Sequence, residues 1–80
     1  MSYTAHHAEQ NRQMRSAAIP ALREVGWMPE PEPRNWTALA INATYIVLRE
    51  FPADVTFNRA RHQVIAVMMD YRGRPGEWTR

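Results

Sequence analysis

The chain has 80 residues, a formal net charge of +2 at pH 7 and no cysteine. A chain of this length forms one domain with a small core, and the lack of cysteine excludes disulfide bonds, thiol catalysis and zinc sites with cysteine ligands. With 45% hydrophobic and 22% charged residues, the sequence is typical of a compact globule and not of a disordered chain. All ten basic residues are arginine, but the low net charge is unlike that of a dedicated nucleic-acid-binding protein.

Targeting and membrane segments are not apparent in the sequence. No N-terminal run resembles the apolar core of a signal peptide, and no stretch reaches the roughly 20 apolar residues needed to cross a bilayer. We therefore expect a soluble, cytoplasmic protein without a membrane partner.

The first predicted helix covers residues 3–25. Pro20 removes the hydrogen bond to the carbonyl of Ser16 and disfavours helical geometry at the residue before it, so we expect a kink or a junction of two short helices there. Gly26, followed by the apolar Trp27, predicts a Schellman-type end to the helix. The apolar side of this helix is predicted to contain Tyr3, His7, Met14, Ala18, Leu22 and Val25.

Prolines at positions 29, 31 and 33 make residues 28–34 a predicted extended strut that separates the first helix from the second. The central helix is predicted over 36–51, the longest apolar run, with Asn35 as its N-cap and Pro52 as its stop. Its core face is predicted to be Trp36, Leu39, Ala40, Ala43, Ile46, Val47 and Phe51. A second apolar stripe consists of Ile41, Tyr45 and Leu48.

The last predicted helix covers 55–72, with Asp54 or Thr56 as its N-cap and a stop at Gly73 and Pro75. Residues 73–80 form a loose tail unless Trp78 docks. Ile65 and Met69 lie well away from the predicted core face, which consists of Phe57, Ala60, Val64, Val67, Met68 and Tyr71. The sequence thus predicts an all-α single domain over 1–80, a small three-helix bundle with a kinked first helix and a proline-rich strut.

Motifs for catalysis, cofactors and metals are weak. His6 and Glu9 could share an ion on one helical face, but two ligands do not make a site. The carboxylates are dispersed along the chain, and with three glycines there is no phosphate-binding loop. We therefore expect no metal, no cofactor and no enzymatic activity.

Surplus apolar surface predicts binding to a protein partner or to a second copy as a homodimer. If the main apolar stripes of three helices face inward, the second stripes remain to be covered, unless the first helix or Trp27 and Trp78 cover them. Aromatic residues, Met and Arg are enriched at interface centres, and the Arg residues suit an acidic partner. The predicted partner-binding residues are Ile41, Tyr45, Leu48, Arg49, Arg59, Arg61, Ile65 and Met69.

An alternative hypothesis is a helix-turn-helix-like regulator that binds DNA or RNA. The start of the last helix would enter the major groove and present Asn58, Arg59, His62 and Gln63 to base edges. The long central helix, the lack of Gly in the turn and the low net charge argue against it. Small size, Arg-only basicity and no cofactor motif are instead the profile of small regulators and of inhibitors encoded by phages or mobile elements, of which anti-CRISPR proteins are one group.

Overall fold

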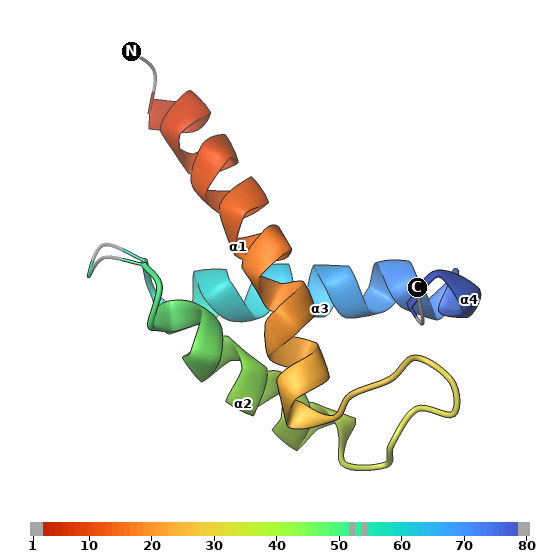
Figure 1. Ribbon diagram of the computed structural model, residues 1–80. Coiled ribbons are helices and arrows are strands. Elements are labelled where there is room, and N and C mark those ends of the chain that lie inside the picture. Colours follow the sequence, from red (N-terminus) through yellow and green to blue (C-terminus); the bar gives the residue numbers. More distant parts are fainter. Residues whose placement is uncertain (1–2, 52, 54, 79–80) are drawn as a thin grey trace.

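The computed structural model describes residues 3–51, 53 and 55–78, and it confirms the all-α prediction (Figure 1). Three main helices each pack against the other two, and a short helix follows at the C-terminal end. In Figure 1, α1 crosses in front of α3 and its N-terminal part projects beyond the other helices. The helices are α1 (Tyr3–Val25), α2 (Trp36–Leu48), α3 (Phe57–Arg72) and α4 (Pro75–Trp78).

The first helix, α1, runs through Pro20 as one element, so a division into two short helices does not occur. Pro20 is exposed to solvent, which lets its ring project from the helix without entering the core. The helix ends in the predicted Schellman motif. Gly26 has φ +87°, its N–H donates to the carbonyl of Arg23 at 3.2 Å, and the N–H of Trp27 donates to the carbonyl of Leu22 at 3.0 Å.

The proline-rich segment lies between α1 and α2, where the sequence predicts it, but it is not straight along its whole length. It turns at residues 30–31 and 34–35, and the peptide bond between Glu30 and Pro31 is cis. Figure 1 shows it as a wide loop beside the C-terminal end of α1. The loop is held to the bundle by Glu32, whose carboxylate accepts from Trp27 Nε1 at 2.9 Å and from Arg72 Nε at 2.8 Å.

The second helix, α2, ends at Leu48 and not at residue 51 as predicted. Beyond Leu48 the chain tightens into bonds between residues three apart, with the N–H of Phe51 donating to the carbonyl of Leu48 at 3.2 Å. The following proline disfavours helical geometry at Phe51, which accounts for the earlier end. Asn35 occupies the N-cap position, but its side chain makes no capping hydrogen bond.

The third helix, α3, begins at Phe57, two residues after the predicted start at 55. Thr56 is its N-cap, and the Thr56 hydroxyl oxygen accepts from the N–H of Arg59 at 3.2 Å. Asp54, the other predicted cap, lies outside the described residues.

The core is built from the inner faces of the three main helices. Thr44 of α2 is fully buried, and its hydroxyl donates to the carbonyl of Ala40 at 2.7 Å. Phe57 and Tyr71, predicted in the core, are half-buried at its edge. The buried apolar residues are Met14, Ala18, Ala21, Leu22, Trp27, Ala40, Ala43, Val47, Val55, Ala60, Val64, Val67, Met68 and Trp78.

The described part of the C-terminal segment is not the predicted loose tail, because Trp78 is buried and α4 forms over Pro75–Trp78. The Trp78 ring lies edge-on to Trp27 and Tyr71, with centroids 5.1 and 5.0 Å away. Arg23 of α1 lies over the same ring at 4.4 Å and donates to the Trp78 carbonyl at 2.6 Å. This aromatic cluster ties the loop after α1 and the chain end to one end of the bundle.

Candidate protein-binding surface

Large apolar side chains are exposed at four of the described positions, and three of the four lie on α2 and α3. Ile41, Tyr45 and Met69 are 37%, 57% and 61% exposed, and Met28 on the loop after α1 is 41% exposed. Exposed apolar residues that gather on one surface mark an interaction site more often than scattered ones do.

The exposed residues of α2 and α3 belong to two rows with a spacing of four residues. Because helix positions four apart lie one above the other, Ile41, Tyr45 and Arg49 share one side of α2. On α3 the row runs from Phe57 to Met69. The rows meet at Tyr45 and Phe57, whose ring centroids are 5.1 Å apart. We call this surface the α2–α3 face and define it as Ile41, Tyr45, Arg49, Phe57, Arg61, Ile65 and Met69.

The predicted apolar anchors are not equally accessible. Leu48 and Ile65 are half-buried and pack against the core, whereas Tyr45 and Met69 are mostly exposed. Phe57 also belongs to the α2–α3 face, although the sequence predicted this residue in the core. The four-residue spacing of Phe57, Arg61, Ile65 and Met69 was the signal that would have placed it there.

Two of the predicted charged residues, Arg49 and Arg61, lie on this face. Arg49 is exposed and has no ion pair within the described part of the chain. Arg61 is half-buried, and its Nε is buried without a hydrogen-bond partner among the described residues. The third predicted charged residue, Arg59, faces α1, where its guanidinium donates to Asn11 Oδ1 at 3.2 Å.

The residues predicted to read nucleic acid do not share an open surface. Arg59 bonds to α1, and Gln63 accepts from Arg15 Nε of α1 at 2.7 Å. Asn58 and His62 are exposed. Because α1 crosses α3, two of the four predicted residues hydrogen-bond to α1, and the other two do not contribute to that contact.

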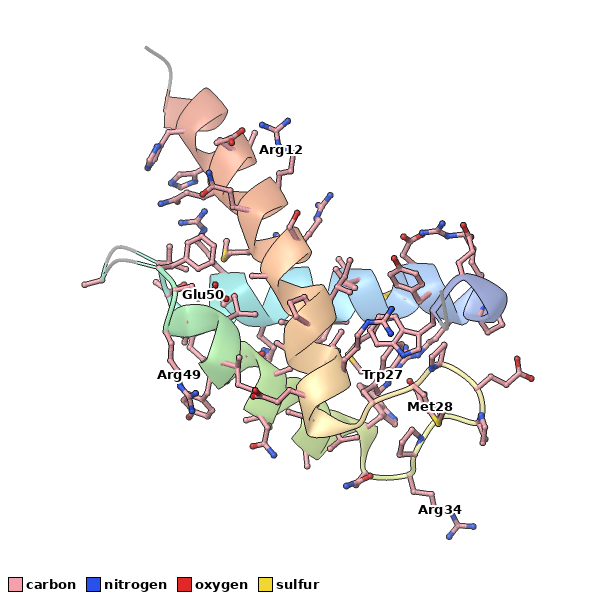
Figure 2. All side chains as sticks on the ribbon, in the orientation of Figure 1. Arg12, Trp27, Met28, Arg34, Arg49 and Glu50 are labelled. Carbon is pink, nitrogen blue, oxygen red and sulfur yellow. The ribbon has the colours of Figure 1, made fainter. Side chains whose placement is uncertain are left out.

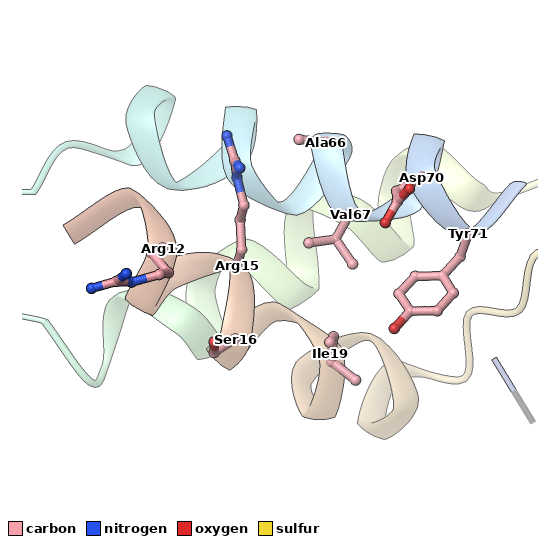
Figure 3. Close-up of a pocket in the computed structure, with 8 residues that line it drawn as sticks. All are labelled: Arg12, Arg15, Ser16, Ile19, Ala66, Val67, Asp70 and Tyr71. Carbon is pink, nitrogen blue, oxygen red and sulfur yellow. The ribbon is translucent and has the colours of Figure 1, made fainter. Parts of the chain in front are cut away.

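A groove of about 530 Å³ lies between α1 and α3 (Figure 3). It depends on how α1 crosses α3, so the sequence analysis did not predict it. Two of its charged groups form ion pairs within the chain, Arg12 with Glu9 and Asp70 with Arg74, and Arg15 donates to Gln63 Oε1. Arg74 donates hydrogen bonds to Asp70 and Glu77, and these bonds raise its pKa, the one to Asp70 more than the one to Glu77. The lining residues are Arg12, Arg15, Ser16, Ile19, Ala66, Val67, Asp70 and Tyr71.

Among the described residues there is no group of three or more His, Cys, Asp or Glu side chains that could hold a metal ion. Nor is any helix in the described ranges long and apolar enough to span a membrane. Comparisons with protein-family models, curated proteins and solved structures found no match.

Proposed function

We propose that this protein is a non-enzymatic interaction protein whose α2–α3 face binds a protein partner and thereby regulates or inhibits it. The exposure of Ile41, Tyr45 and Met69 on that one face carries the proposal. Burying a fully exposed large apolar side chain contributes about 1.5–3 kcal/mol, and these three contribute in proportion to the part that is still exposed. Together with Arg61 on the same face, they give the mixture of aliphatic, aromatic and guanidinium groups that interface centres favour.

The protein-binding function is favoured over nucleic-acid binding by the pairing of α3 with α1. Arg59 and Gln63 already donate to or accept from α1, so they could reach base edges only by leaving those bonds. A small helical inhibitor from a phage or another mobile element, of the anti-CRISPR type, is the kind of protein that this proposal describes.

The proposal is tested by capture followed by reconstitution. The tagged protein is used to isolate partners from lysate of the source cells, and each identified partner is purified and titrated in a calorimeter. In the double variant Ile41→Glu, Tyr45→Glu, two carboxylates replace apolar contacts, and we expect affinity to fall at least about 100-fold.

Met28→Glu is the matched control, since Met28 is the exposed large apolar residue that lies on the loop and not on the face (Figure 2). We expect it to leave the affinity within about twofold. Loss of binding in Met28→Glu with retention in the double variant would move the site to the loop. Unfolding of the double variant, seen by circular dichroism, would show that Ile41 and Tyr45 serve the fold and not a partner.

A further inference from the structure

The α2–α3 face has a single sign of charge, which restricts what can dock there. Helix α2 contains no charged residue, and Arg49 follows directly after it. Figure 2 shows Glu50, the nearest carboxylate in sequence, on the opposite side of the end of α2 from Arg49. The described part of the face therefore presents Arg49 and Arg61 without a carboxylate between them.

Asp70 of α3 and Glu32 of the loop are already paired elsewhere. Asp70 pairs with Arg74 beside α4, and Glu32 pairs with Arg72, whose guanidinium also lies over the Trp36 ring at 4.8 Å. These pairs leave the two arginines of the face to interact with an external group.

Arg61 is the group on this face that most needs an acceptor. Its Nε is buried and has no partner among the described residues, although the side chain as a whole is half-buried. A buried donor without an acceptor is costly, and a carboxylate can accept two parallel bonds from a guanidinium, one of them from Nε. A small rotation of the side chain on docking would present that edge to a carboxylate.

Resting on the proposed function, we infer that the partner of the α2–α3 face is a protein surface with apolar residues flanked by Asp or Glu carboxylates. The apolar part covers Tyr45, Ile41 and Met69, and one carboxylate pairs with Arg61. A second carboxylate pairs with Arg49 at the end of α2.

A second copy of this chain does not have that chemistry. Two copies that join through the same face are related by a two-fold axis, so both sides of the interface are this positively charged face and neither copy offers a carboxylate to the arginines of the other. Like charges brought together at an interface oppose binding. The face therefore disfavours the homodimer that the surplus apolar surface first suggested.

The test uses two stapled amphipathic helical peptides with the same leucine stripe, one flanked by Glu and one flanked by Lys. Each is titrated into isotopically labelled protein, and amide shifts are followed by NMR. We expect the Glu-flanked peptide to shift α2 and α3 residues of the face and to bind at least about tenfold tighter than the Lys-flanked one. Sedimentation of the protein alone is expected to show a monomer.

Two matched charge variants locate the contact. Arg61→Gln is expected to weaken the Glu-flanked peptide about tenfold, and Arg34→Gln, an exposed loop residue, less than twofold. If Arg61→Gln does not fold, Arg49→Gln on the exposed helix end provides the same comparison.

The outcomes separate this inference from the proposed function. Equal binding of both peptides to the face would overturn the acidic partner but support the docking surface. A dimer that buries the face would replace the acidic partner with a second copy. Shifts confined to the α1–α3 groove, or no shifts with either peptide, would overturn the proposed function itself.

Discussion

At the residue scale, the two N-cap residues are expected to contribute differently to the free energy of unfolding. Thr56 bonds the N–H of Arg59, whereas Asn35 makes no capping bond. Thr56→Ala should lower the free energy of unfolding by about 1 kcal/mol, and Asn35→Ala should change it by less than about 0.5 kcal/mol. Urea denaturation followed by circular dichroism measures both. Equal effects of the two substitutions would mean that the Thr56 bond contributes nothing.

The two glycines that follow main helices differ in the same way. Gly26 has φ +87°, a conformation that other residues rarely adopt, whereas Gly73 has φ −79° and room for a Cβ. We expect Gly26→Ala to destabilise the fold by about 1–2 kcal/mol. Gly73→Ala should be neutral or should stabilise it by up to about 1 kcal/mol. Thermal melting of the two variants side by side tests this, and a neutral Gly26→Ala would contradict the Schellman assignment.

At the element scale, Pro20 is a defect inside α1 that the packing of the helix tolerates. It removes the donor that would bond the carbonyl of Ser16, and its side chain is exposed, so nothing in the core depends on it. Pro20→Ala should therefore stabilise the protein by about 1–3 kcal/mol. Pro29→Ala, in the loop, is the control. It should destabilise the protein by up to about 1 kcal/mol, because it increases the conformational entropy of the unfolded chain and removes no contact of a helix. A destabilising Pro20→Ala would show that the proline shapes α1 for packing.

Helix α4 has four residues, of which Trp78 is the buried one. Trp78→Ala removes a buried ring that contacts Trp27 and Tyr71, and we expect a loss of about 3–5 kcal/mol of stability together with most of the near-ultraviolet dichroism. Glu77→Gln, an exposed neighbour, should cost less than about 0.5 kcal/mol. Trp78→Ala with unchanged stability would mean that the docked segment is independent of the bundle.

At the scale of the whole molecule, the fold should unfold in one step. Each main helix packs against both others, so no helix can leave without exposing the core that the other two share. We expect far- and near-ultraviolet dichroism to give coincident urea transitions, with a free energy of unfolding of about 5 kcal/mol for so small a core. An early loss of signal from the aromatic cluster alone would contradict this single unit.

The sequence by itself determined the three main helices, although not the end of α2 or the short α4, because local chemistry largely decides where a helix begins and ends. Gly26 and Trp27 closed α1, Thr56 opened α3, and helical periodicity separated core positions such as Ala40 from exposed ones such as Ile41. These signals act over a few residues and need no knowledge of neighbouring helices.

Only the tertiary structure decided how the second stripes are used. Because α1 crosses α3, Arg59 and Gln63 form hydrogen bonds with side chains of α1, whereas Tyr45 and Met69 remain exposed. Trp78 docked because Trp27 and Arg23, far away in sequence, contact its ring together with the nearby Tyr71. A helical wheel gives the direction of each side chain around its own axis but not which helix lies in that direction, and packing between helices settles that.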